Sequence, residues 1–322
     1  MLPAWLRMAL LASLAGCEDP PTRPDAVDAG EMDAGIGVAP DAAIRCANDW
    51  ADAGPLPDPD PEPRFDDAPA QVRVSLTEAN GAPYLDVRGL LRTSAVPQGE
   101  DLIESARSGS CRLLVWERVA WFCDPPCDAD RLCGPEGACV ELPAVLSAGP
   151  LTLTAGAEVR TVEPQNPGYP AYFAQWDGAP FVGLDLVGVS AAGDTFPPFD
   201  LTVDVLALDP PTLTDAEPLD GTDLVLRWAC PDPRTRIRVN FTSASLHGSP
   251  AHSALECDLP DVGTVTVPAP LVSRFVAESD WRCEAGCNPH RLVRYVADRA
   301  TVDGRAVELV VHRDSTFDLL PR

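Results

Sequence analysis

Short runs of alternating polar and apolar residues recur along this chain, and they constrain its fold more than any other feature. The runs QVRVSLT and YLDVRGL flank Asn80-Gly81, and RLVRYVADRATVDGRAVELVVHR surrounds Asp303-Gly304. A period of two is typical of strands with one buried face, and Asn-Gly and Asp-Gly are the dipeptides that tight hairpin turns favour. Helical periodicity is nearly absent. The sequence therefore predicts an all-β fold with hairpins at these two positions.

Similar runs between these hairpins extend the prediction. They are CRLLVWERVAWFC, LTLTAG, AEVRTVEP, PFVGLDLVGVSAAG, FDLTVDVLAL, TDLVLRWAC, TRIRVNFTS and GTVTVPAPLV. Many short strands separated by turn residues predict sandwiches, and the C-terminal part resembles an immunoglobulin or fibronectin-type domain in architecture. There, Trp228 precedes Cys230 by two residues, so its ring can pack beside a disulfide. Residues 68–322 suffice for two small sandwiches or one elaborated domain.

The N-terminus predicts export and lipid anchoring. The opening MLPAWLRMALLASLAGC has a short apolar run, which fits a signal peptide and is too short to span a bilayer. It ends in Leu14-Ala15-Gly16-Cys17, which resembles the lipobox of bacterial lipoproteins and makes Cys17 the expected acylation site. The alternative is an ordinary signal peptide followed by a chance cysteine. Acyl chains on Cys17 would hold the protein at a lipid bilayer.

An acidic stalk is expected after the anchor, over residues 17–67. It contains 14 acidic residues, frequent proline and alanine, and only three arginines. Few apolar side chains and unbalanced charge cannot offset the entropy of ordering, so the stalk is predicted to be disordered and extended. Its carboxylates could instead bind calcium weakly. Cys46 and Trp50 interrupt this composition and suggest a point of attachment to the folded body.

The cysteines predict a disulfide framework in the exported protein. Besides Cys17 there are ten, an even number: Cys46, Cys111, Cys123, Cys127, Cys133, Cys139, Cys230, Cys257, Cys283 and Cys287. Five of them cluster between Cys111 and Cys139. If these five form disulfides with one another, one is left over and needs a partner outside the cluster, and Cys46 is the nearest in sequence. We then expect Cys230 to pair with Cys257 and Cys283 with Cys287.

Two segments share the pattern W-x-C-x3-C-x3-R-L. They begin at Trp121 (WFCDPPCDADRL) and Trp281 (WRCEAGCNPHRL), and we call them the Trp121 segment and the Trp281 segment. In the Trp281 segment, two cysteines and His290 could bind zinc, with Asp280 near, but the Trp121 segment has Asp130 in place of the histidine. A redox site would require C-x-x-C. We therefore expect disulfide staples and no metal at either segment.

Composition narrows the classes of partner. The chain has 24 arginines, no lysine and a net charge of −25. The absence of lysine excludes Schiff-base and Walker-type chemistry, and the acidity argues against nucleic acid and anionic headgroups. Neutral or cationic partners are favoured on this basis.

From about residue 111 to 275 the chain resembles a broad group of uncharacterised surface lipoproteins of Gram-negative predatory soil bacteria. The matching motifs are CDPPCDADRLCGPEGACV, SAGPLTLTAG, FPPFDLTVDV, LDGTDLVLRW and DVGTVTVPAPLV. The resemblance implies architecture and location at the cell envelope, and it transfers no site.

Catalytic patterns are sparse. The histidines are His247, His252, His290 and His312, without H-E-x-x-H, and no G-x-S-x-G is present. The pair in HGSPAH could form a weak metal site or a nucleophile with its base, but a polar loop is the simpler interpretation. The segment NPGYPAYFAQWDG is the best candidate for an exposed loop, and its Tyr169, Tyr172 and Trp176 could bind a sugar or other ligand; core aromatics are the alternative.

These patterns together predict one organisation of the chain. Residues 1–16 form the signal peptide, 17–67 the stalk, 68–142 a β-hairpin and cysteine-rich module, 143–208 part of a β-sandwich, and 209–322 an immunoglobulin-like sandwich. We expect a non-catalytic protein of the cell envelope, in the outer membrane, with a structural or binding role and no cofactor. An adhesin for surface glycans or envelope proteins and a metal-dependent enzyme are the alternatives.

Overall fold

The computed structural model describes part of the chain, all of it within one unit, Ala43–Arg322. The described residues are 62–65, 68–79, 82–94, 102–116, 123, 126–128, 131–133, 139–141, 143–166, 168, 170–177, 186–205, 208–216, 219–242, 253–278 and 290–319. The predicted signal peptide, Cys17, Cys46 and the stalk up to residue 61 lie outside this range.

The described residues form β-strands and one helix, which confirms the all-β prediction. In chain order the elements are β1 (Ala70–Ala79), β2 (Ala82–Leu91), β3 (Leu102–Ser108), β4 (Cys111–Trp116), β5 (Arg131–Cys133), β6 (Cys139–Glu141), β7 (Leu151–Ala155), β8 (Glu158–Val162), β9 (Tyr172–Asp177), β10 (Leu186–Ala191), β11 (Phe199–Asp204), β12 (Thr212–Ala216), β13 (Leu224–Ala229), β14 (Arg236–Thr242), β15 (Ser253–Pro260), β16 (Thr264–Val267), α1 (Ala269–Glu278), β17 (His290–Val302) and β18 (Arg305–Phe317).

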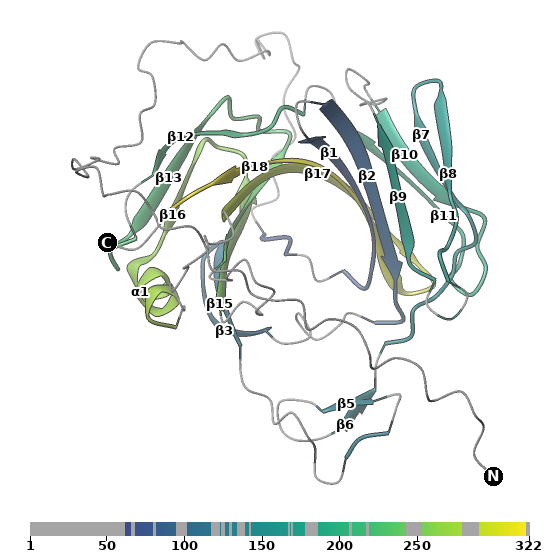
Figure 1. Cartoon of the computed structure of the whole chain (residues 1–322), viewed down its shortest axis with the longest axis horizontal. Helices are drawn as coiled ribbons and strands as arrows, with labels where there is room; N and C mark the ends of the chain where they lie inside the picture. The colour runs from purple at the N-terminus through teal and green to yellow at the C-terminus, as the bar shows by residue number, and fades with distance from the viewer. Residues whose placement is uncertain are drawn as a thin grey trace, which may run out of the picture. The chain divides into compact units, whose positions relative to one another are not determined.

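One large sheet organises the fold. Its nine strands follow the order β3-β4-β15-β14-β17-β18-β1-β2-β9, and Figure 1 shows that it curves into an arch. The smaller sheets are β11-β10-β7-β8, β12-β13-β16 and β5-β6. The four-stranded and three-stranded sheets cover the outer, convex side of the arch at its two ends (Figure 1).

Two separate apolar cores lie beneath these covering sheets. In the first sandwich, Val72 and Leu85 of the large sheet pack in one cluster with Leu153 of β7. In the second sandwich, Ile237 of β14 shares a cluster with Leu226 of β13. The predicted sandwich architecture is therefore present, and the two sandwiches, which the sequence left open as either two small sandwiches or one elaborated domain, share one continuous sheet.

The long hairpin β17–β18 joins the two sandwiches. Its strands pair from His290↔Phe317 to Val302↔Arg305. Leu292 lies in the second core, whereas Val307 lies in the first, because each strand is long enough to cross from one core to the other. The connecting Asp303 and Gly304 have φ of 49° and 77°, the left-handed conformation of a tight hairpin turn.

Both predicted hairpins are confirmed. β1 and β2 pair antiparallel from Ala70↔Leu91 to Ala79↔Ala82, around the Asn-Gly dipeptide. β1 also pairs in parallel with β18, more than 200 residues away in the chain. Strands from all three expected segments between residues 68 and 322 thus enter one sheet.

The sequence run GTVTVPAPLV is only partly a strand. β16 ends at Val267, and α1 begins at Ala269. Proline is tolerated in the first turn of a helix, where Pro270 lies, and Asp223 Oδ1 accepts a hydrogen bond of 2.7 Å from Ala269 N–H. Leu271 and Phe275 then face the second core. The expected strand over these residues was therefore wrong.

The disulfides also correct the sequence prediction. Cys257 bonds to Cys111 of the neighbouring strand β4, and the two residues are register partners, so the expected Cys230–Cys257 pair is wrong. Cys230 is disulfide-bonded as well. Within the part of the chain that the structure describes, no helix is long and apolar enough to cross a membrane.

Candidate binding site

The concave face of the large sheet is the strongest candidate for a binding surface. Along β1 the even-numbered residues from Val72 to Leu76 enter the first core, so Arg73 and Ser75 project to the opposite side. The same alternation directs Arg88, Arg238 and Arg291 to this side. We call this side, marked by the four arginines, the concave face.

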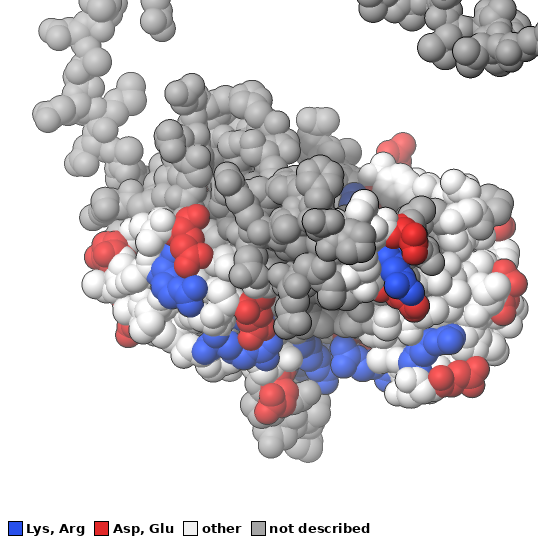
Figure 2. Space-filling view, turned by 90° about the horizontal axis from the view of Figure 1, so that it is seen from below, with Lys and Arg blue, Asp and Glu red and all other residues white. Residues whose placement is uncertain are grey.

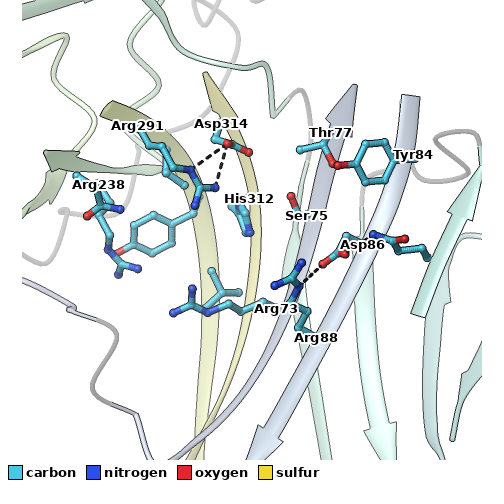
Figure 3. Close-up of a pocket in the computed structure, with 15 residues that line it drawn as sticks. Arg73, Ser75, Thr77, Tyr84, Asp86, Arg88, Arg238, Arg291, His312 and Asp314 are labelled. Atoms are coloured by element: carbon cyan, nitrogen blue, oxygen red, sulfur yellow. Dashed lines mark hydrogen bonds and ion pairs between the residues drawn. The ribbon is translucent and has the colours of Figure 1, made fainter. Parts of the chain in front are cut away.

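A hollow of about 330 Å³ lies on this face. It is lined by side chains of β1, β2, β9, β14, β17 and β18, and Figure 3 shows the arginines together with Tyr84 and His312 over the strands. Its size falls at the lower end of the range of small-molecule sites. Because the lining side chains stand on hydrogen-bonded strands, their positions are held by the sheet.

The hollow is locally basic although the chain is strongly acidic. Arg88 Nε lies 2.8 Å from Asp86 Oδ1, and Arg291 Nη2 lies 2.9 Å from Asp314 Oδ2. Four arginines and two aspartates line the hollow, which leaves two positive charges in excess when His312 is neutral. Figure 2 shows basic and acidic side chains side by side on the face seen from below. Anionic groups are therefore favoured here, in contrast to the expectation from net charge.

A buried carboxylate anchors one wall of the hollow. Asp258 is fully buried, and its oxygens accept hydrogen bonds from Arg236 Nη2 (2.7 Å), Arg238 Nη2 (2.9 Å) and the Tyr295 hydroxyl (2.7 Å). Burial, and then the charge of Asp258, raise the pKa of Tyr295. Tyr295 is therefore a constant hydrogen-bond donor, and the two guanidinium groups are held in place before any ligand arrives.

Comparison with known proteins does not identify the chain. No family model matches the sequence, and no curated protein matches it. A function proposed for the site therefore rests on its chemistry.

The aromatic residues proposed to bind a ligand do not form an exposed platform. The segment predicted as a loop contains strand β9, an edge strand of the large sheet, which begins at Tyr172. Tyr172 is 2% exposed, and its hydroxyl accepts from Ala148 N–H (2.8 Å) and donates to Gly149 O (2.9 Å). Trp176 is half-buried against the first core, and Tyr169 lies outside the described residues. Tyr172 is thus a core residue.

The cysteine cluster is oxidised where the structure describes it. The sulfurs of Cys123, Cys127 and Cys139 lie within 4.8 Å of one another, as a metal site would require. However, Cys127 bonds to Cys139, and Cys123 is also disulfide-bonded, so none of the three is available as a thiolate ligand. The C-x3-C pair of the Trp121 segment does not close on itself, because Cys127 bonds to Cys139 and not to Cys123.

The remaining cysteines are only partly described. Cys133 lies in β5, but its side chain is outside the description. Cys283 and Cys287 of the Trp281 segment lie outside the described residues. The disulfide predictions for these three therefore remain predictions.

His290, the candidate zinc ligand, is a core histidine. It is 2% exposed and packs against Phe241 and Phe317. Nδ1 accepts from Thr242 N–H at 3.3 Å, and Nε2 lies 2.8 Å from Leu319 O, so one neutral tautomer satisfies both. Burial lowers its pKa. Both ring nitrogens are occupied by the backbone, and His247 and His252 lie outside the described residues.

The arginines of the hollow were not predicted as binding residues from the sequence. Each occupies an alternate position of a predicted strand, as in QVRVS, DVRG, RIRVN and HRLVR. This alternation was a usable signal that one side of these strands is basic. It did not show that the β1–β2 hairpin lies beside β18 while β14 and β17 lie on the other side of that strand, because these pairs come from distant parts of the chain.

Proposed function

We propose that this chain is a non-catalytic lipoprotein of the cell envelope, anchored in the outer membrane through acylated Cys17, that binds a partner on the concave face. The anchor rests on the lipobox-like Leu14-Ala15-Gly16-Cys17 and the acidic stalk behind it. The observation that carries the binding role is the basic hollow on a hydrogen-bonded sheet. Rigid elements hold recognition groups more accurately than loops do.

The alternatives from the sequence have less support. A glycan platform of three aromatic residues loses Tyr172 to the first core. A metal-dependent enzyme centred on His290 would need a ring nitrogen that is not already hydrogen-bonded to the backbone. Arginine side chains, four of which line the hollow, suit recognition of anionic groups.

Anchoring is tested by cell fractionation. The full chain, produced with its leader in a Gram-negative host, is expected in the membrane fraction, and the Cys17→Ser variant is expected to lose the acyl chains and become soluble. An unchanged distribution of the variant would contradict the anchor.

The binding surface is tested with short polyglutamate as the probe. We expect salt-sensitive binding to the mature chain in detergent micelles, reduced about tenfold or more by Arg88→Gln with Arg291→Gln. Arg160→Gln with Arg227→Gln, two exposed arginines outside the hollow, is the matched control for loss of two charges. Equal binding by all variants would show that the concave face is not the anion-binding surface.

A further inference from the structure

A short segment that precedes β1 lies on the concave face. Glu62 to Phe65 come from the end of the acidic stalk, and Figure 1 draws this region beneath the arch. Their main-chain hydrogen bonds are with residues more than 170 positions away in the chain. The segment is therefore held on the sheet by tertiary contacts.

Main-chain atoms make the polar contacts of this segment. Arg236 Nη2 donates to Glu62 O at 2.8 Å, and Arg238 Nη2 donates to Arg64 O. In the opposite sense, Arg64 N–H donates to Asp258 Oδ1 at 3.1 Å. Asp258 itself is fully buried, so these groups form a built site for an extended peptide backbone.

An aromatic side chain completes the contact. The guanidinium of Arg112 lies 4.0 Å from the centre of the Phe65 ring, and that of Arg107 lies 5.0 Å away. Phe65 is 5% exposed. Cation–π contacts of this kind contribute more when the cation is desolvated, as the buried Arg112 is. The sheet therefore offers a subsite for one aromatic residue beside its backbone-binding groups.

The segment and the hollow share a wall. Arg238 holds Arg64 O and also lines the hollow, as does Tyr295, the hydrogen-bond partner of Asp258. An extended peptide bound to Arg236, Arg238 and Asp258 can thus continue towards the other arginines of the hollow. Acidic residues surround Phe65 in PDPDPEPRFDDA, residues 57–68, so an acidic peptide complements this face in charge.

We propose that the concave face is a site for an extended acidic peptide of a partner protein, and that Glu62–Phe65 occupies it as an internal ligand which the partner displaces. The proposal rests on the proposed function and names its class of partner. Recognition uses backbone hydrogen bonds and one aromatic anchor, so it tolerates variation at other positions of the peptide. Displacement would free the end of the stalk from the sheet.

The test adds the chain's own segment in trans. A labelled peptide of residues 57–68 is titrated into the mature chain in detergent micelles and followed by fluorescence anisotropy. We expect Phe65→Ala to bind this peptide at least about tenfold more tightly than the wild type, because the internal competitor is weakened. The same peptide with alanine for its phenylalanine should bind about tenfold less tightly.

Two further variants make the test decisive. Phe173→Ala removes an exposed aromatic that also lies under an arginine, Arg88, and should leave peptide binding as in the wild type. If Phe65→Ala does not fold, Arg64→Pro removes the main-chain donor to Asp258 together with the Arg64 side chain, and it should also raise the affinity. A folded variant that binds the peptide no better than the wild type would overturn the proposal.

Other outcomes separate this proposal from the proposed function. Membrane anchoring that persists without peptide binding would overturn only the peptide site. If the wild type binds the peptide but the Cys17→Ser variant stays in the same cell fraction as the wild type, only the anchor would be overturned. A wild-type dimer that Phe65→Ala dissociates would replace the partner protein by a second copy of this chain.

Discussion

The two sandwiches share one sheet but are held together differently. In the first sandwich the covering strands pack on a core that is almost wholly apolar, and Asp86 and Glu308 are the buried charged residues described there. In the second, buried arginines and carboxylates accompany the apolar core, and a disulfide joins β4 to β15. Because removing one partner of a buried ion pair leaves an uncompensated charge, we expect polar substitutions to cost more in the second sandwich than in the first.

The largest expected effect is at Asp261 in the second sandwich. Its carboxylate accepts hydrogen bonds from Trp228 Nε1 (2.6 Å) and Arg294 Nε (2.7 Å), and the Arg294 side chain is 3% exposed. Asp261→Asn should lower the free energy of unfolding by about 3–5 kcal/mol, because it leaves a buried cation without its counter-charge. Urea denaturation measures the change. Asp215→Asn, in the exposed pair with Arg227, should cost less than about 1 kcal/mol, and equal losses would contradict the comparison.

The disulfide is the next test. Cys111 and Cys257 close a loop of 146 residues, whereas Cys127 and Cys139 are separated by 12. Replacing the first pair by serine should cost about 2–4 kcal/mol, and the second pair less, because closure entropy grows with loop length. Denaturation of both double variants without reductant gives the ranking. A larger loss for the short loop would show that loop closure does not dominate.

A smaller effect is expected in the first sandwich. Tyr172→Phe removes the hydroxyl that bonds Ala148 N–H and Gly149 O, and it should cost about 1–2 kcal/mol, because two backbone groups lose a partner near the core. Tyr84→Phe, on the concave face, serves as the control and should stay within about 0.5 kcal/mol of the wild type. Thermal unfolding of both compares them. Equal losses would mean that the Tyr172 hydroxyl does not support this core.

The smallest effect concerns pH and belongs again to the second sandwich. Burial lowers the pKa of His290 in the folded chain, so below about pH 6.5 the unfolded chain binds the proton more readily. Stability should therefore fall as pH decreases through this window, by at most about 1.4 kcal/mol per pH unit from this residue. Unfolding at pH 7.5 and 5.5 measures the difference, and His290→Gln should flatten this part of the dependence. An unchanged pH dependence in His290→Gln would exclude this residue as the cause.

Local patterns predicted the elements of the fold better than their arrangement. The Asn-Gly and Asp-Gly hairpins follow from residues that lie next to one another in the chain, and both are confirmed. α1 was missed because its cap, Asp223, lies 46 residues before the first helical residue. Tyr172 was taken for a loop residue because its backbone partners, Ala148 and Gly149, cannot be identified from the sequence around it.

The sequence by itself determined the β class, the two hairpins and the prediction of an exported, disulfide-bonded chain, because turn dipeptides, alternation and cysteine content act locally or through composition. Only the tertiary structure decided that two sandwiches share one sheet, that Cys257 bonds to Cys111, and that four arginines meet on the concave face. The reason is that strand order depends on pairings between distant segments, such as β1 with β18, which no local pattern specifies.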